Sequence, residues 1–255
     1  MIGIGFQISN AANICRNKTL EMKSFKSVKL WYDLYPVPNK YMVTARYDNV
    51  LVALSILNRI NSSDILESVG DSNGWLENCS LFLQSNSQPV YRNGSMPYFT
   101  CLSVGTIYLV MKFDPLNFTG NDLLYIANDL YAGDLWIRIS TFLDGSVPFW
   151  RFSVRNGDYP EYSYDTSEFP MVMHNGFVFL KIYRNPFASH IQIFDFFTGV
   201  ESPCVDSNAG IFGSNYVFNL SGGNNFVYEF IFEAGQPTAE SFITEYLIRK
   251  YTPLL

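Results

Sequence analysis

Residues 222–251 decide the fold: Gly222-Gly-Asn-Asn-Phe-Val-Tyr-Glu-Phe-Ile-Phe-Glu233 is followed, after a short turn, by Pro237-Thr-Ala-Glu-Ser-Phe-Ile-Thr-Glu-Tyr-Leu-Ile-Arg-Lys-Tyr251. The first segment is rich in aromatic and β-branched residues, which predicts a strand over 226–233. The second segment predicts a helix with Thr238 at its N-cap and Glu240 in its first turn. Five apolar side chains of this helix share one stripe and indicate that it packs on the sheet: Ala239, Phe242, Ile243, Tyr246 and Leu247.

Upstream of this segment, the chain consists of short strand-like runs separated by turn signals. We predict strands at 98–104, 106–113, 123–128, 134–141, 147–155, 161–166, 170–174, 177–184, 190–196 and 211–219. No stretch between them has the length or the period of a crossover helix, which disfavours a parallel α/β sheet. The sequence therefore predicts an all-β sandwich or barrel closed by one short C-terminal helix.

The N-terminal part of the chain divides into an arm and the start of a domain. Residues 1–27 lack a sustained period and predict an N-terminal arm, whereas residues 28–255 predict a single domain that opens at Val28-Lys-Leu-Trp-Tyr-Asp33. Residues 39–88 are interrupted by turn signals and have the least regular pattern. Within them, Val50 to Ile60 fits a helix by its Leu and Ala content, or a strand by the turns on either side.

The composition excludes several classes of protein. Charged residues make up 16% of the 255 residues, aromatic residues make up 17%, and the formal net charge is −6. Because phosphate binding needs clustered Lys and Arg, no nucleic-acid partner is expected. The longest apolar run, Val50 to Leu57, is far shorter than the roughly 20 residues of a spanning helix, so we expect no membrane segment, and we expect no signal peptide. The four cysteines are widely spaced, which disfavours zinc and suits reduced thiols.

Three segments carry a resemblance to a known family. They are Ser27-Val-Lys-Leu-Trp-Tyr-Asp33, Ser87-Gln-Pro-Val-Tyr-Arg-Asn-Gly94, and the strand and helix of residues 222–251. They resemble the opening strand, the segment before the first long core strand, and the final strand and closing helix of the concanavalin A-like, laminin-G-like jelly rolls found in bacterial and phage proteins. The resemblance implies a jelly-roll β-sandwich of two antiparallel sheets. It implies no single activity, because this fold hosts lectins, glycosidases, adhesins and structural spacers.

Catalytic motifs are not recognisable in the sequence. The β-glucan-cleaving enzymes of this fold place their carboxylates on one strand face as Glu-x-Asp-x-(x)-Glu, and the nearest stretch here, Glu161-Tyr-Ser-Tyr-Asp165, lacks the second Glu. Only two histidines occur, and no Ser-His-Asp, Cys-His or metalloprotease arrangement can be assembled. We therefore expect a protein that is not an enzyme and needs no cofactor.

Metal binding stays open. Some relatives hold calcium through loop oxygens, and Asp114, Asn117, Asn121 and Asp122 form an oxygen-rich turn. The spacing of these residues does not match an EF-hand, and such residues are common in ordinary turns.

Strand alternation predicts a surface that mixes aromatic and hydrogen-bonding side chains. Along residues 134–141, apolar residues that point to the core alternate with Trp136 and Arg138 on the opposite face. The same alternation in later strands completes a set of predicted contact residues: Trp136, Arg138, Arg151, Tyr162, Tyr164, Tyr183 and Gln192. This mixture suits a sugar-stacking platform or a protein interface, unless the second sheet or the arm covers it.

Together these observations favour a non-catalytic structural protein of a bacteriophage virion, such as a capsid decoration, head-fibre or tail-associated jelly roll. Its expected partners are other virion proteins, further copies of itself in a homo-oligomer, and cell-surface glycans of the host. Such a protein is made in the host cytoplasm and located in the virion. The alternative is a cellular carbohydrate-binding or adhesion module, and a glycoside hydrolase is a third, disfavoured hypothesis.

Overall fold

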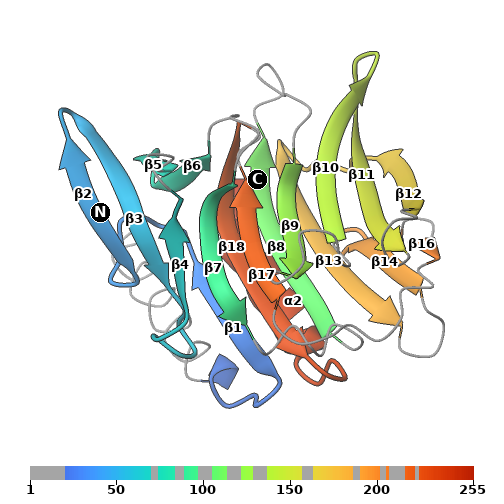
Figure 1. Ribbon diagram of the computed structural model, residues 1–255, viewed down its shortest axis with the longest axis horizontal. Coiled ribbons are helices and arrows are strands. Elements are labelled where there is room, and N and C mark those ends of the chain that lie inside the picture. Colours follow the sequence, from blue (N-terminus) through green and yellow to red (C-terminus); the bar gives the residue numbers. More distant parts are fainter. Residues whose placement is uncertain are drawn as a thin grey trace, which may run out of the picture.

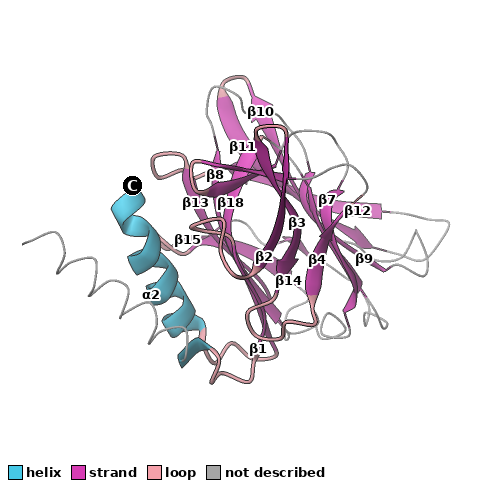
Figure 2. Ribbon diagram, turned by 90° about the vertical axis from the view of Figure 1, so that its left-hand side faces the viewer, coloured by secondary structure: helices cyan, strands magenta, loops and turns pink. Residues whose placement is uncertain are grey.

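The computed structural model describes residues 21–69, 74–83, 89–96, 105–113, 122–128, 137–156, 163–185, 190–201, 205–206, 216–221 and 224–255. Its strands pair antiparallel and form two facing sheets, and helix α2 (Glu240–Tyr251) is followed by the short 3-10 helix η2 (Thr252–Leu254) (Figure 1). Figure 2 shows α2 lying along one side of the strands. The predicted all-β sandwich with a short C-terminal helix is therefore confirmed. No helix in the described ranges is long and apolar enough to span a membrane.

The sheet next to α2, called here the helix-side sheet, has the strand order β1, β18, β8, β13, β14. Their bounds are β1 (Val28–Asp33), β18 (Asn225–Ala234), β8 (Gly105–Phe113), β13 (Phe177–Asn185) and β14 (His190–Asp195), with the short strands β15 (Val200–Glu201) and β16 (Val205–Asp206) paired to β14.

The second sheet, called here the facing sheet, has the order β2, β3, β4, β7, β17, β9, β10, β11, β12. Their bounds are β2 (Met42–Tyr47), β3 (Val50–Leu57), β4 (Ile65–Ser68), β7 (Pro89–Met96), β17 (Tyr216–Ser221), β9 (Asp122–Asn128), β10 (Ile137–Asp144), β11 (Val147–Asn156) and β12 (Ser163–Pro170). The hairpin of β5 (Gly74–Glu77) and β6 (Ser80–Leu83) joins the two sheets, because β5 pairs with β3 and β6 pairs with β18.

Several predicted elements need correction. The segment from Val50, which fitted either a helix or a strand, is strand β3, and the seemingly irregular residues 39–88 contain five short strands. The strand predicted at 161–166 is β12, which continues in register with β11 as far as Pro170, whereas the strand predicted at 170–174 is wrong: residues 171–173 belong to no strand and His174 forms only an isolated bridge with Phe177. The strand predicted at 98–104 lies outside the described residues.

The main core lies between the two sheets. Leu180 and Ile182 of β13 point into it, and Ile139 and Trp150 enter from the facing sheet. The Trp150 ring meets Phe113 edge-on at 5.9 Å between centroids. Each large apolar side chain buried in this way contributes roughly 1.5 to 3 kcal/mol, so this layer holds the two sheets together.

A second core lies between the helix-side sheet and α2. Trp31 of β1 contacts Tyr246 of α2 edge-on at 5.8 Å, and Ile243 and Leu247 are fully buried. The arm predicted at residues 1–27 can be followed from residue 21, where Met22 is buried in this core. Residues 1–20 lie outside the described residues, so the division at residue 27 stays a prediction.

The N-terminus of α2 is capped by a strand residue rather than by Thr238. The predicted N-cap at Thr238 is wrong by one residue: the helix begins after Ala239, which makes no side-chain cap. The backbone N–H of Ala239 instead donates to Glu233 Oε1 at 2.7 Å, and the Ser27 hydroxyl donates to the same atom at 2.7 Å. Because Glu233 ends β18, a buried carboxylate on the sheet fixes where the helix starts and complements its positive end.

A second buried carboxylate, Glu229, ties the sheet to the end of α2. Glu229 is fully buried and accepts hydrogen bonds from the Trp31 indole N–H, from the Tyr251 hydroxyl at 2.6 Å and from Lys250 Nζ at 2.7 Å. Lys250 Nζ also donates to Asp33 Oδ1 at 2.7 Å, and Asp33 forms an ion pair with Arg59.

These groups shift one another's ionisation. Burial raises the pKa of Glu229, and the positive charge of Lys250 opposes that rise. Desolvation by itself lowers the pKa of Lys250, but the carboxylates of Glu229 and Asp33 more than offset it, so the pKa of this lysine is raised and it stays charged. A buried charge without its partner costs several kcal/mol, so the network holds only while α2 is docked.

We predict that Lys250→Ala lowers the free energy of unfolding by about 3 to 5 kcal/mol, because it leaves Glu229 fully buried without its cation and leaves Asp33 paired with Arg59 alone. Urea denaturation measures this loss. The matched control is Arg249→Ala, which removes an exposed i,i+4 ion pair with Glu245 and should cost only a few tenths of a kcal/mol. Equal effects of the two substitutions would contradict the buried network.

We also predict that the protein unfolds in alkali as its buried tyrosines ionise. Burial raises the pKa of Tyr91, Tyr108, Tyr246 and Tyr251 above the ordinary value of 10.0. Their contribution to stability is therefore complete below pH 10 and is lost as the pH rises further, because only the unfolded chain releases these protons readily. Tyrosinate absorbance and circular dichroism should change together above pH 10. If all tyrosines ionise while the circular dichroism signal of the strands is unchanged, the buried positions of these four tyrosines are wrong.

Candidate functional site

The structure separates the predicted contact residues onto two sheets. Arg138, Arg151 and Tyr164 lie on β10, β11 and β12 of the facing sheet, whereas Tyr183 and Gln192 lie on β13 and β14 of the helix-side sheet. Two further predicted residues, Trp136 and Tyr162, lie outside the described residues. The prediction that these residues share one face is therefore wrong. Alternation along a strand shows which side chains point the same way, but it does not show to which sheet the strand belongs. A binding role for any of these residues stays a prediction.

On the facing sheet, Arg151 lies in an exposed cluster on the side away from the core. Its Nε donates to Glu168 Oε1 at 2.7 Å, and its guanidinium carbon lies 4.5 Å from the centroid of the Phe142 ring. Phe142 in turn packs on Phe149 at 5.5 Å. The charge of Arg151 is therefore already paired with Glu168, so an external ligand would have to compete with this ion pair.

On the helix-side sheet, Tyr183 and Gln192 satisfy each other. They face one another in register, and the Tyr183 hydroxyl donates to Gln192 Oε1 at 2.6 Å. Lys181, two residues earlier on the same strand face, binds Glu240 at the start of α2 and lies 4.6 Å from the Tyr183 ring. This pair therefore borders the helix docking surface.

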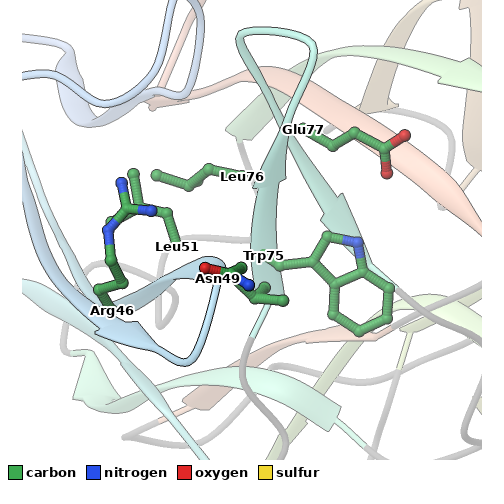
Figure 3. Close-up of a pocket in the computed structure, with 7 residues that line it drawn as sticks. Arg46, Asn49, Leu51, Trp75, Leu76 and Glu77 are labelled. Carbon is green, nitrogen blue, oxygen red and sulfur yellow. The ribbon is translucent and has the colours of Figure 1, made fainter.

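A recess that was not predicted lies between the β2–β3 hairpin and β5. Its volume is about 560 Å³, and its lining consists of Arg46, Asn49, Val50, Leu51, Trp75, Leu76 and Glu77. Figure 3 shows Arg46, Leu51 and Leu76 on one side of β5, and Trp75 and Glu77 on the other. We call this recess the hairpin groove.

Backbone geometry and one buried tyrosine position the walls of the hairpin groove. The hairpin turns through Asp48, whose φ of 51° is a left-handed conformation that Asp tolerates better than most residues. The Tyr91 hydroxyl donates to the carbonyl of Ala53 at 2.7 Å and accepts from the N–H of Gly74 at 3.1 Å, which holds β5 against β3. A side chain at Gly74 would lie 2.9 Å from Tyr91 Oη, so only glycine fits there without a shift.

The hairpin groove combines apolar walls with polar groups that are available to a ligand. Leu51, Trp75 and Leu76 are half-buried, while Arg46 and Glu77 are exposed and, within the described ranges, have no ion-pair or hydrogen-bond partner. On the Leu76 side of β5 the groove can therefore cover an apolar surface and offer the cationic donors of Arg46 to hydroxyl or carboxyl groups, while Glu77 lies on the other side of the strand (Figure 3).

Sequence reasoning missed the hairpin groove because residues 39–88 lacked a regular pattern. Its residues come from two short hairpins that meet only through the pairing of β3 with β5. The one local signal was Trp75, an aromatic residue between the turn signals at Gly74 and Asn78.

Metal ligands do not gather in the described ranges, where no group of three or more His, Cys, Asp or Glu residues could hold an ion. Of the oxygen-rich turn considered above, Asp114, Asn117 and Asn121 lie outside the described residues, and only the backbone of Asp122 is described, at the start of β9.

No model of a known protein family matches the chain, and no curated protein sequence matches it. Solved structures do share its fold. The binding domain of botulinum neurotoxin DC in complex with SialylT superimposes with a TM-score of 0.51 at 13% sequence identity, over 87% of this chain and 51% of that one. The binding domain of botulinum neurotoxin serotype D/C gives a TM-score of 0.51 at 11% identity, over 89% and 53%.

This chain thus spans about half the length of the neurotoxin domains that it resembles, and at such identities the similarity shows the fold alone. The CBM2 module of the evolved Dit of Lactobacillus casei BL23 phage J-1 aligns more loosely, with a TM-score of 0.44 at 8% identity, over 66% of this chain and 80% of that module. A superposition of that quality carries no argument about function.

Proposed function

We propose that this protein is a non-catalytic binding module that recognises carbohydrate in the hairpin groove. The observation that carries the proposal is the composition of the groove: the apolar side chains of Leu51 and Leu76 lie beside Arg46, which has no ion-pair or hydrogen-bond partner among the described residues, in a recess of about 560 Å³ (Figure 3). This volume lies within the roughly 300 to 1,000 Å³ typical of small-ligand sites.

The chemistry of a sugar ring matches this lining. A pyranose has an apolar C–H face, which packs on Leu51 and Leu76 (Figure 3), and a rim of hydroxyl groups, which need both donors and acceptors. Arg46 supplies donors, and Asn49 supplies both donors and acceptors. A flat protein surface would not need such a recess, which favours a small ligand over a protein partner.

The fold is compatible with receptor binding. Two solved structures of this fold are neurotoxin binding domains, and one of them is in complex with SialylT. This likeness supports a binding role for this sandwich. It does not identify the sugar that this chain binds.

The charged residues support binding rather than catalysis. A hydrolase needs carboxylates that reach the substrate, whereas Glu229 and Glu233 are fully buried beneath α2 and already hydrogen-bonded there. Glu77 is exposed, and no second carboxylate is among the described residues that line the hairpin groove.

A place in a bacteriophage virion remains a prediction from the sequence. The proposed carbohydrate site suits either a virion protein that contacts host glycans or a cellular adhesion module. Mass spectrometry of purified particles from the source of the gene would distinguish the two, because a virion component must copurify with capsid proteins.

We predict that Arg46→Ala weakens carbohydrate binding about tenfold to hundredfold, because a hydrogen bond from a charged group contributes roughly 1.5 to 3 kcal/mol. The full chain is first screened on a glycan array that contains neutral and sialylated oligosaccharides. Calorimetry with the best binder then compares the variant with the parent.

Arg151→Ala is the matched control, since Arg151 is also an exposed strand arginine of the facing sheet but lies on β11, outside the hairpin groove, and is paired with Glu168. It should leave affinity unchanged. Loss of binding in Arg151→Ala with Arg46→Ala unaffected would move the site to the outer face of β10 to β12. No binding to any glycan on the array would defeat the proposal.

A further inference from the structure

Strand β2 forms one end of the facing sheet, and its outer edge is bare. It pairs with β3 only, and no other strand in the described ranges approaches that edge (Figure 1). The carbonyl of Tyr41 accepts the Leu57 N–H at 2.7 Å and so points toward β3. Tyr47 pairs with Val50 across the two-residue turn, and counting back from it, on the near side of the irregularity between Val43 and Thr44, directs the backbone N–H and C=O groups of Arg46 and Thr44 away from β3.

The outward backbone groups of β1, the end strand of the helix-side sheet, are hydrogen-bonded. β1 has no strand beyond it, but the N–H of Trp31 donates to Asn58 Oδ1 at 2.9 Å and its carbonyl accepts from the N–H of Arg59 at 2.8 Å. The Asn58 amide also donates to the carbonyl of Lys29 at 2.9 Å. Among the described residues, the edge of β1 is thus covered and that of β2 is not, and an uncovered edge is a template for another strand.

The side chains around this edge are also unusually apolar for an exposed surface. Val43 and Tyr47 of β2 are 48% and 56% exposed, and Val50 of β3 is 47% exposed. These three residues are half of the six large hydrophobic residues that are exposed in the described ranges. An apolar cluster beside unpaired backbone groups is the composition of an interface rather than of a protected edge.

We infer that β2 pairs antiparallel with β2 of a second copy of this chain, which joins two facing sheets into one continuous sheet. A two-fold axis passes beside Thr44, so that its backbone N–H and C=O bond those of Thr44 of the partner subunit. Met42 then lies opposite Arg46 of the partner subunit. In this register the outward N–H and C=O groups of the two strands form hydrogen bonds with each other.

Charge complementarity selects this register. With Thr44 opposite its own copy, Lys40 at the start of β2 comes opposite Asp48 of the partner subunit at the hairpin turn, and the symmetric pair forms at the other end. Val43 lies beside Ala45 of the partner subunit, so the apolar clusters of both copies meet on one side of the seam. A shift of the register separates the charges and uncovers Val43.

Sedimentation velocity on the full chain tests this inference. Because the seam is short against the about 1,200 to 2,000 Å² of a stable interface, the dimer should be weak and should form as concentration rises. Thr44→Pro should abolish it, since proline removes the central N–H while leaving the bonds to β3 intact. Thr44→Ala keeps the N–H and should still dimerise.

A charge-swap mixture tests the register. Lys40→Glu alone and Asp48→Lys alone should each weaken self-association about tenfold, because like charges then face each other at both ends of the seam. Mixed together, the two variants should form a heterodimer, since the introduced charges are complementary. Thermal melting controls for strain at Asp48, whose φ is positive.

Three results would overturn the inference: a parent chain that stays monomeric at high concentration, a dimer that survives Thr44→Pro, or growth beyond a dimer, which a closed two-fold seam does not allow. Carbohydrate binding by the monomeric Thr44→Pro variant should persist. Its loss would count against the proposed groove and not against the seam.

Discussion

The buried carboxylate of Glu229 is the constraint on which the rest of the structure depends. A charge with no solvent access must be matched by donors, and its donors come from Trp31 of β1 and from Lys250 and Tyr251 at the end of α2. Undocking the helix would therefore remove two of the donors to this charge and would also expose the apolar stripe of the helix. Glu233 fixes the start of the helix and Glu229 fixes its end, so β1, β18 and α2 are held together as one unit.

This unit determines where a binding surface can lie. The helix-side sheet is packed on both faces, by the main core and by α2, so the middle of that sheet has no free face for a ligand. The edge away from the helix is built differently, from the β2–β3 hairpin and the β5–β6 hairpin that bridges the sheets. The hairpin groove and the outer edge of β2 both belong to this part of the molecule and share Arg46 and Val50, but the groove opens toward β5, whereas the outer edge of β2 faces away from β3.

Local signals in the sequence predicted what is local in the structure. Alternation placed Leu180 and Ile182 in the core and Lys181 and Tyr183 on the opposite face, and the apolar stripe identified α2. The assignment of strands to sheets could not be predicted, because it depends on pairings between distant segments such as β8 with β13. Glu229 was equally hidden, since composition rules place a glutamate on the surface unless its partners are known. The hairpin groove was missed because it too depends on a pairing between distant segments, that of β3 with β5.

The central claim is that ligand enters the hairpin groove, and a nitrogen-15 correlation spectrum can report on it directly. Backbone N–H groups and the indole N–H groups of the four tryptophans give separate signals in this spectrum. On addition of the oligosaccharide that binds best, the account predicts that the backbone N–H signals of Leu51 and Leu76 in the groove wall (Figure 3) shift, while the indole signals of Trp31, bonded to Glu229, and of buried Trp150 stay in place. A shift of Trp136 with Leu51 and Leu76 unmoved would contradict the account.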